Sequence, residues 1–223
     1  MKNRYDNLLR ENNKAILDLV AYNPILFIMT AKEIEKVYKD GDRVLEIGTG
    51  EGDSAFPVFE HTKAHIDLLD ISQEMLNIAK EKLSKFTTRA EYICEDANKY
   101  LEKASSYNII FSGWTIHNFN HVDQLTLLRS IYESLTPEGY FFLMDKVYPD
   151  TGGEILLKKQ NERYSRYLPE DVASAIIAHE IEDATDQYRL QEGVLMRMLG
   201  EIGFKEVKII DRIERDVVIK AKK

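Results

Sequence analysis

The sequence predicts an α/β fold built on a largely parallel sheet, and three observations lead to this fold class. Between Arg43 and Lys146, short apolar segments alternate with amphipathic ones, which is typical of successive βαβ units. A glycine-rich turn follows the first apolar segment and leads into a helical pattern. The amphipathic segments carry apolar stripes at helical spacing that we expect to pack on the sheet: Met75, Leu76, Ala79 and Leu83, then Leu125, Leu128, Ile131 and Leu135.

Local sequence signals predict the helices and strands on either side of residues 43–146. Residues 1–21 carry a mixed apolar face that predicts a helix, and a second helix is expected from Pro24 to about Tyr38, closed by Gly41. After a loop marked by Tyr148, Pro149, Gly152 and Gly153, a polar segment is followed by a short helix over 173–182. The last helix is expected over 191–202, and two strands joined by a turn near 212–215 end the chain.

The stretch Arg43–Ala55, R-V-L-E-I-G-T-G-E-G-D-S-A, carries the strongest functional signal. Its glycines at 48, 50 and 52 allow a sharp turn and a close approach of a ligand to the backbone. A helix N-terminus just beyond them, with Asp53 or Ser54 as N-cap, would turn amide hydrogens toward that ligand. Glu46 stands at the end of the strand, where its carboxylate can aim across the crevice. The sequence therefore predicts a ligand site at this turn.

Two features indicate which kind of ligand. A dinucleotide-binding loop would need its third glycine where Asp53 stands. Asp70 ends the next predicted strand, about 20 residues further on, where adenosine-type cofactors have their ribose hydroxyls held. The structural alternative for Asp70 is a strand-end helix cap.

The pattern E-I-G-T-G-E-G (46–52) resembles the first motif of the class I S-adenosylmethionine-dependent methyltransferases. Four later stretches are similar to further strands and helices of that family, in the same order. They are HIDLLDISQEMLNIAKEKL (65–83), EYICEDANKY (91–100), YNIIFSGWTIHNF (107–119) and SLTPEGYFFLMDK (134–146).

This resemblance implies a Rossmann-like three-layer sandwich. Its sheet would have seven mostly parallel strands in the order 3-2-1-4-5-7-6, with the last strand antiparallel and the ligand crevice between strands one and four. Residues 1–40 would form a helical cap over the cofactor site, and residues 41–223 the methyltransferase domain. Residues 148–190 would be its substrate-recognition or lid insertion.

The resemblance also implies a set of cofactor contacts. Asp70 would accept hydrogen bonds from both ribose hydroxyls, and Ile71 would pack on the adenine. Asp96 and the amide of Ala97 would hold the adenine edge. The other expected contacts lie around the methionine portion: Glu46, Gly48, Thr49, Gly50, Gly52, Ser112 and Gly113. The cofactor would be S-adenosyl-L-methionine, and its product S-adenosyl-L-homocysteine.

Methyl transfer is an in-line displacement in which the protein chiefly aligns the reactants and excludes water. A hydroxyl acceptor needs a base to remove its proton, whereas a neutral amine needs only orientation. His117, which matches the family's fourth-strand histidine, is the candidate catalytic residue, with an architectural role as the alternative. Trp114, Tyr148 and His179 are candidate substrate contacts. His117, His121 and Asp123 lack a fourth ligand, and His179-Glu180 lacks the second histidine of a zinc protease motif, so no metal site is predicted.

Composition limits the partners. The 223 residues carry a formal net charge of −8, which opposes a nucleic-acid backbone and favours a small-molecule substrate. The single cysteine, Cys94, lies in an apolar segment and is expected to be buried and unpaired, and a reducing compartment is the default. The N-terminus lacks the apolar core of a signal peptide, and no apolar run is long enough to span a bilayer, which favours a cytoplasmic location. An apolar face on the first two helices leaves a homodimer open.

Three other functions stay open at this stage. The same fold could remodel the cofactor itself, as the carboxy-S-adenosylmethionine synthases do, or could modify tRNA. It could also bind the cofactor as a regulatory subunit. A nicotinamide-dependent oxidoreductase would need a different glycine spacing, and the chain contains no Tyr-x-x-x-Lys pair.

Overall fold

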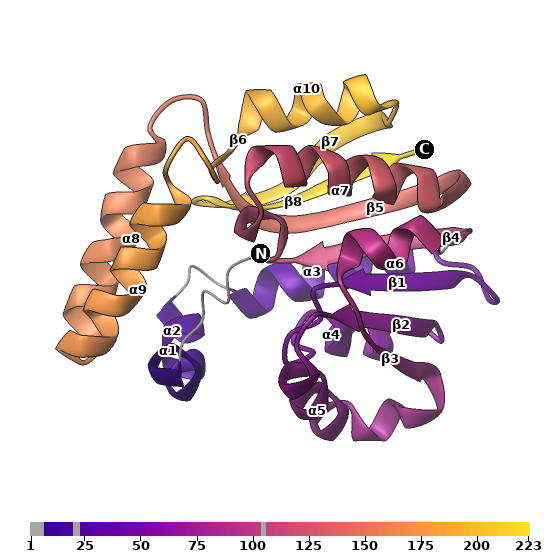
Figure 1. Ribbon diagram of the computed structural model, residues 1–223, viewed down its shortest axis with the longest axis horizontal. Helices are drawn as coiled ribbons and strands as arrows, with labels where there is room; N and C mark the ends of the chain where they lie inside the picture. The colour runs from indigo at the N-terminus through magenta and orange to yellow at the C-terminus, as the bar shows by residue number, and fades with distance from the viewer. Residues whose placement is uncertain (1–6, 20–22, 104–105) are drawn as a thin grey trace.

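The computed structural model describes residues 7–19, 23–103 and 106–223. Its sheet has the strand order β3-β2-β1-β4-β5-β8-β7, and the short β6 pairs with β5 beside this path (Figure 1). β8 is antiparallel to both of its neighbours, whereas β1 to β5 pair in parallel. The strands are β1 (Arg43–Ile47), β2 (His65–Asp70), β3 (Ala90–Cys94), β4 (Tyr107–Gly113), β5 (Leu135–Tyr148), β6 (Leu190–Gln191), β7 (Lys205–Ile213) and β8 (Asp216–Lys222).

The predicted fold class is confirmed, and the strand count differs by one. The additional strand is β6, a pair of residues held against Val147 and Tyr148 at the end of β5. Two residues are too few to produce a periodic pattern, so the sequence offered no signal for β6. With β6 set aside, β7 and β8 take the sixth and seventh places, and the order matches the expected one.

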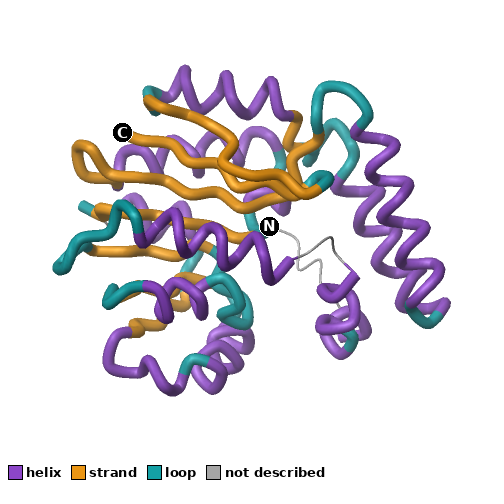
Figure 2. Tube along the Cα trace, turned by 180° about the vertical axis from the view of Figure 1, so that it is seen from behind, coloured by secondary structure: helices purple, strands orange, loops and turns teal. Residues whose placement is uncertain are grey.

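Helices cover both faces of the sheet and make three layers (Figures 1 and 2). α6 (Ala97–Lys103), α7 (His121–Ser134) and α10 (Glu192–Ile202) pack on one face, in a core that includes Leu45, Ile110 and Phe141. α3 (Asn23–Glu35) and α4 (Ala55–His61) pack on the other, against Val44 and Phe111, with Ala79 of α5 (Gln73–Lys82) in the same core. Neighbouring strand residues point to opposite faces, so each central strand is apolar on both sides.

Four helices stand apart from these layers, and we call them the helical cap. They are α1 (Asn7–Glu11), α2 (Asn13–Leu19), α8 (Gly153–Tyr167) and α9 (Glu170–Asp183). α8 and α9 form an antiparallel hairpin that projects beyond the carboxyl ends of the strands (Figure 1). Leu9 and Ile16 pack with Tyr164, Val172 and Ile176 in a core of their own. The cap is thus assembled from two segments that are far apart in the chain, residues 7–19 and 153–183.

Several sequence expectations need correction here. Residues 7–19 form two short helices rather than one, and 1–6, 20 and 21 lie outside the described residues. The helix expected to reach Tyr38 ends at Glu35, and its Ala31 and Ile34 pack in the core on the α4 face of the sheet. The polar segment before residue 170 is the helix α8, whose buried residues include Gln160 and Tyr164, so its inward face was hidden among polar residues. Across the described part of the chain, no helix combines the length and apolar character that a membrane span requires.

Candidate active site

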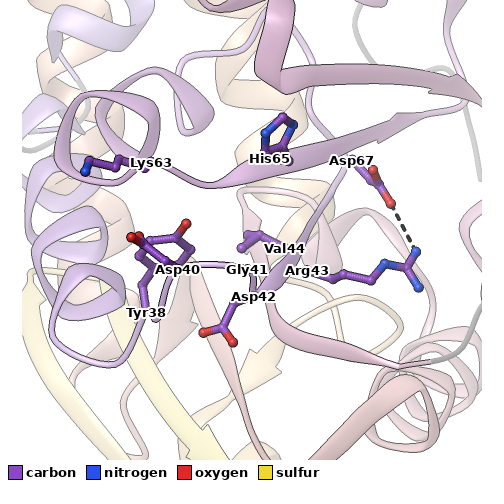
Figure 3. Close-up of a pocket in the computed structure, with 9 residues that line it drawn as sticks. All are labelled: Tyr38, Asp40, Gly41, Asp42, Arg43, Val44, Lys63, His65 and Asp67. Atoms are coloured by element: carbon purple, nitrogen blue, oxygen red, sulfur yellow. Dashed lines mark ion pairs between the residues drawn. The ribbon is translucent and has the colours of Figure 1, made fainter.

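A pocket of about 620 Å³ lies at the carboxyl ends of β1, β2 and β4, between the sheet and the helical cap. The glycine turn and Asp70 line one half of it, and residues of β5, α9 and the β7–β8 turn line the other. A second hollow of about 450 Å³ lies at the opposite edge of the sheet, where Arg43 and His65 begin β1 and β2 (Figure 3). Ligands of open α/β sheets bind at the carboxyl ends, so the larger pocket is the candidate site.

The glycine turn is shaped by positive φ angles at Gly48 (74°), Gly50 (53°) and Gly52 (83°). A Cβ on Gly48 would stand 2.1 Å from Oγ1 of Thr115, whose hydroxyl donates to the Gly48 carbonyl at 3.2 Å. A Cβ on Gly50 would meet no atom within 4 Å, because this residue borders the pocket. Gly48 is therefore fixed by packing behind the turn, and Gly50 leaves space in front of it.

Glu46 is fully buried beneath the turn, in the penultimate position of β1. The hydroxyl of Ser54, the N-cap residue of α4, donates to its Oε1. Burial raises the pKa of Glu46 to about 8, although the hydrogen bond from Ser54 opposes the shift. Glu46 thus supports the turn from behind and does not line the pocket, whereas Thr49 does.

Asp70 ends β2 in the half of the pocket that the glycine turn lines. Its Oδ2 accepts from the Gly50 amide and its Oδ1 from the Ser72 amide, both at 2.8 Å. The side chain therefore orients the glycine turn as well as facing the pocket. The helix cap of α5 is Ser72, whose hydroxyl accepts from the Met75 amide. Ile71, beside Asp70, is 49% exposed and lines the same half, as a platform for a flat ring would be.

The other predicted cofactor residues are placed differently. Asp96 accepts from the Lys99 amide at 3.1 Å at the start of α6, and neither Asp96 nor Ala97 lines the pocket. Ser112 is buried and donates to the Ile47 carbonyl at 2.9 Å, and Gly113 after it borders the pocket. Gly52 packs toward Leu83 on the far side of the turn.

His117 lies in a single 3-10 turn (Ile116–Asn118) after β4 and lines the pocket. Its Nδ1 is 2.5 Å from Oδ1 of the fully buried Asp145, and Oδ2 of that carboxylate accepts from the His117 amide at 3.2 Å. An ionised carboxylate can only accept, so Nδ1 donates to Asp145, and in the neutral imidazole Nε2 then keeps its lone pair. Asp145 on β5 thus fixes both the orientation and the tautomer of the imidazole.

A network of buried charges completes the far half of the pocket. Glu180 and Asp183, one turn apart on α9, both bind Lys146 of β5, at 3.3 and 2.8 Å. Glu180 also binds Arg215, in the β7–β8 turn, at 2.9 Å. Burial raises the pKa of a carboxyl, but Lys146 and Arg215 outweigh it and hold the pKa of Glu180 at about 2. These ion pairs join the helical cap to the sheet.

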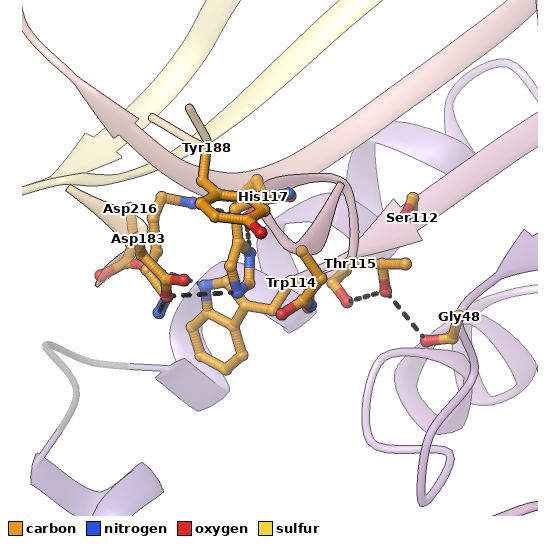
Figure 4. Close-up of polar contacts among 12 residues, drawn as sticks. Gly48, Ser112, Trp114, Thr115, His117, Asp183, Tyr188 and Asp216 are labelled. Carbon is orange, nitrogen blue, oxygen red and sulfur yellow. Dashed lines mark hydrogen bonds and ion pairs between the residues drawn. The ribbon is translucent and has the colours of Figure 1, made fainter. Parts of the chain in front are cut away.

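Trp114 also lines this half of the pocket. It adopts φ 45°, an unusual conformation for a bulky residue, and its indole N–H donates to Asp216 Oδ1 at 2.9 Å. Figure 4 shows Trp114, His117, Asp183 and Asp216 gathered here, with Thr115 turned toward Gly48. Burial raises the pKa of Asp216 to about 6, while Arg215 and the indole oppose the rise. Of the other predicted substrate residues, His179 lines the pocket and Tyr148 does not, because its hydroxyl is bound by Arg215 at 2.7 Å.

Sequence reasoning missed most of this half: Asp145, Lys146, Glu180, Asp183, Arg215 and Asp216. A signal existed in the acid–base pairs at the end of β5 and at the final turn, and in two acids three residues apart on α9. The expectation for Cys94 was wrong, since its side chain is exposed on the edge strand β3, where only one neighbouring strand covers it. Within the described ranges no group of three or more histidine, cysteine or acidic side chains is arranged to hold a metal ion.

Comparison with known proteins identifies the family. Residues 44–139, which contain the glycine turn, Asp70 and His117, match the model of a methyltransferase domain. Residues 44–139 therefore form a methyltransferase domain, and the enzyme is an S-adenosylmethionine-dependent methyltransferase. It resembles a methyltransferase structure of this cofactor class from Methanococcus maripaludis, with a TM-score of 0.65 and 20% identity, over 100% of this chain and 95% of the other. The resemblance to the family, the enzyme class and the cofactor are thereby confirmed.

Two curated relatives of this methyltransferase act in different ways. A carboxy-S-adenosyl-L-methionine synthase of Nautilia profundicola is 25% identical, over 80% of this chain and 76% of its own length. A ubiquinone/menaquinone biosynthesis C-methyltransferase of Geotalea uraniireducens is 27% identical, over 78% and 75%. The chain spans only 57% to 62% of the length of three other matching structures, one of which was solved with S-adenosylhomocysteine.

The methyltransferase pocket fits its cofactor by its own chemistry. The space in front of Gly50 lets the cofactor come close to the backbone, and a larger side chain at this position would fill that space. The Asp70 carboxylate suits a pair of ribose hydroxyls, because it has two oxygens that each accept more than one hydrogen bond. The half of the pocket around Glu51, Asp53, Asp70 and Glu74 is acidic, which favours a cationic sulfonium ligand.

Proposed function

We propose that this enzyme methylates a small-molecule acceptor that carries a dissociable proton, with His117 as the general base. The observation that carries the proposal is the His117–Asp145 pair on the wall of the pocket that also holds the glycine turn and Asp70. Base and cofactor site thus share one cavity, which is what a proton-coupled transfer requires.

The cofactor half supplies binding and alignment. Asp70 would hold the ribose, Ile71 would cover one face of the adenine, and Gly48, Thr49, Gly50 and Gly113 would surround the methionine portion. When bound, S-adenosylmethionine supplies an activated methyl group on a sulfonium with a neutral leaving group. The remaining task for the protein is to orient the acceptor and to exclude water.

His117 is prepared for proton removal by its surroundings. Asp145 accepts a hydrogen bond from Nδ1–H, and in the neutral imidazole Nε2 keeps its lone pair. As Nε2 takes up a proton, the buried carboxylate stabilises the imidazolium that forms. His117 is only 7% exposed, so few water molecules compete with the acceptor for this nitrogen.

The shape and charge of the site favour a small acceptor. We call the part of the pocket around His117, Glu180 and Asp183 the acceptor half. Ile16 and Leu17 of α2 also line the pocket, so a polymer would have to pass the helical cap to reach it. Its charged wall offers no cationic surface for phosphates, since Lys146 and Arg215 are both bound by carboxylates. The net charge of −8 acts in the same direction.

A second candidate has one specific observation in its favour. The chain is similar over most of its length to a carboxy-S-adenosyl-L-methionine synthase, so the cofactor itself could be the group that is altered. An anionic partner would then need a cation in the acceptor half. Both cations described there are already paired with Glu180, which weighs against this candidate.

Calorimetric titration with S-adenosylhomocysteine tests the cofactor site, with NADH as the comparison ligand. We expect S-adenosylhomocysteine to bind with micromolar affinity and NADH not to bind. Asp70→Ala should abolish binding, whereas Glu81→Ala, an exposed acid on α5, should leave it unchanged. A folded protein that fails to bind S-adenosylhomocysteine would refute the proposal. Mass spectrometry of the adenosyl product then separates the candidates, because only the second yields a carboxylated sulfonium.

A further inference from the structure

We propose that the methyl acceptor is a primary amine on an apolar body, and that Asp183 and His117 together receive its nitrogen. The inference rests on the proposed function and narrows it from any acceptor with a dissociable proton to one chemical class. It follows from the spacing of two acceptor atoms, from the charge balance around them and from the apolar side chains that complete the wall.

The spacing is the first argument. Asp183 Oδ2 lies 3.8 Å from His117 Nε2, beyond hydrogen-bonding distance. Because Nδ1 carries the imidazole proton, Nε2 is an acceptor, and a carboxylate oxygen is one too. A group placed between them must donate twice. A primary amine has two N–H donors and an ammonium three, whereas a hydroxyl has one.

The charge balance is the second argument. Three carboxylates line this half, on Glu180, Asp183 and Asp216, and Asp145 lies behind His117. They face two cations, Lys146 and Arg215, each held by a carboxylate at less than 3 Å. The excess of negative charge attracts a cationic acceptor and repels an anionic one.

The rest of the wall indicates the body of the acceptor. Apolar side chains reach the pocket from four parts of the chain: Ile16 and Leu17 of α2, Phe27 of α3, Trp114 directly after β4, and Ile176 of α9. Phe27 and Trp114 pack edge to face with their ring centres 5.2 Å apart. Such a surface gains free energy by covering an aliphatic or aromatic group, not a sugar or a phosphate.

The reaction balances with these residues alone and the cofactor. The ammonium gives one proton to His117 Nε2 and becomes a neutral amine, and one of its two remaining N–H groups donates to Asp183. The nitrogen lone pair forms the new C–N bond as the S–C bond breaks, and the S–C electron pair stays on sulfur. The product leaves as an N-methylammonium ion, and His117 returns its proton to solvent.

The first test identifies the product. The protein is incubated with S-adenosylmethionine carrying a CD3 group and a deproteinised yeast extract, and labelled products are sorted by mass spectrometry into N-, O- and C-methylated compounds. We expect the label in N-methylated amines. Label confined to O- or C-methylated products, or no labelled product from protein that binds S-adenosylhomocysteine, overturns the inference. Loss of S-adenosylhomocysteine binding would instead refute the proposed function on which it rests.

The second test does not depend on turnover. Protein labelled with 15N-histidine and saturated with S-adenosylhomocysteine is titrated with phenethylamine and, separately, with 2-phenylethanol. The amine should shift the His117 Nε2 resonance and the alcohol should not. Asp183→Asn should weaken the amine response about tenfold or more, because a charge-assisted hydrogen bond is lost. Glu170→Gln, which removes an exposed acid from the same helix, should leave it unchanged. Equal responses to amine and alcohol, no response to the amine, or an unaltered response in Asp183→Asn would overturn the inference.

Discussion

Glu180 and Arg215 bind each other across the boundary between the helical cap and the sheet. Glu180 Oε2 lies 2.9 Å from Arg215 Nη2, and both residues are less than 5% exposed. Arg215 reaches this position from the tight turn between β7 and β8, and Glu180 from the last turn of α9. The pair therefore ties the final strands to the segment that covers the acceptor half of the pocket.

Glu180→Gln should lower the free energy of unfolding by about 3 kcal/mol or more, because it leaves Lys146 and Arg215 buried with one carboxylate fewer. Urea denaturation at pH 7, followed by far-ultraviolet circular dichroism, measures the change. Glu170→Gln, at an exposed position of α9, is the matched control and should stay within about 0.5 kcal/mol of the wild type. Equal stability of the two variants would show that the ion pair does not hold the cap in place.

Glu180 should also determine how the free energy of unfolding changes at low pH. Burial raises the pKa of Glu180, but Lys146 and Arg215 overcome this and lower it from 4.5 to about 2. A depressed folded-state pKa gives stability that is complete above the unfolded pKa and is lost as the pH falls through the folded one. The wild type should lose on the order of 3 kcal/mol between pH 4.5 and pH 2 through this group. Urea titrations across that range should show a shallower loss in Glu180→Gln, and parallel curves would contradict the assignment.

Glu46 should make the free energy of unfolding fall as the pH rises, the opposite of the effect of Glu180. Its burial raises the folded-state pKa from 4.5 to about 8, so the stability associated with its protonated form is present below pH 4.5 and is lost as the pH rises through 8. Glu46→Gln keeps the shape without the charge. We expect it to raise the free energy of unfolding by a few kcal/mol at pH 9 and to have little effect at pH 4.5. Denaturation of the ligand-free protein at both values tests this, and a stabilisation that does not change with pH would argue against a buried ionisation.

Much of the pocket wall around the glycine turn could be predicted from the sequence, whereas the charged wall around Glu180 could not, for a physical reason. Gly48, Gly50 and Asp70 belong to one βαβ unit, so their spacing along the chain fixes their positions in space. His117 meets Asp145 across two adjacent strands, and Arg215 meets Glu180 across a helical hairpin of no fixed length. Such contacts depend on tertiary packing, which residue spacing does not encode. The buried face of the α8–α9 hairpin could not be recognised from the sequence either. It carries polar residues, Gln160 and Glu180, whose hydrogen bonds form only in the folded protein.

Gly48 and Gly50 should respond differently to alanine. At Gly50 the cost in stability is limited to the positive φ, about 1–2 kcal/mol, since no atom lies near the new Cβ. At Gly48 the Cβ would also collide with Thr115, which raises the cost to about 3 kcal/mol or more. Gly50→Ala should nevertheless bind S-adenosylhomocysteine about tenfold or more weakly, because its methyl group enters the pocket. Denaturation and calorimetry on both variants test this, and normal affinity in Gly50→Ala would exclude the turn as the cofactor contact.

Asp145→Asn tests the role of the carboxylate beside His117. Asp145 accepts from the imidazole Nδ1 with one oxygen and from the His117 amide with the other. An asparagine has one acceptor oxygen, so its NH2 group must face one of these two donors, and the imidazole is released toward the other tautomer. Methyl transfer should fall about a hundredfold or more, while S-adenosylhomocysteine affinity stays within about twofold, because Asp145 acts on the base and lies outside the cofactor half.

The nitrogen resonances of His117 in 15N-labelled protein report the tautomer without an acceptor being known. The wild type should show a protonated Nδ1 and an unprotonated Nε2, and Asp145→Asn a mixture of the two forms. Asp186→Asn, which removes an exposed carboxylate bound to Arg189, is the control and should keep the wild-type tautomer. An unchanged tautomer in Asp145→Asn would show that the carboxylate does not orient the base. A changed tautomer with undiminished transfer would show that His117 does not take the proton, and that it serves the architecture of the fourth strand instead.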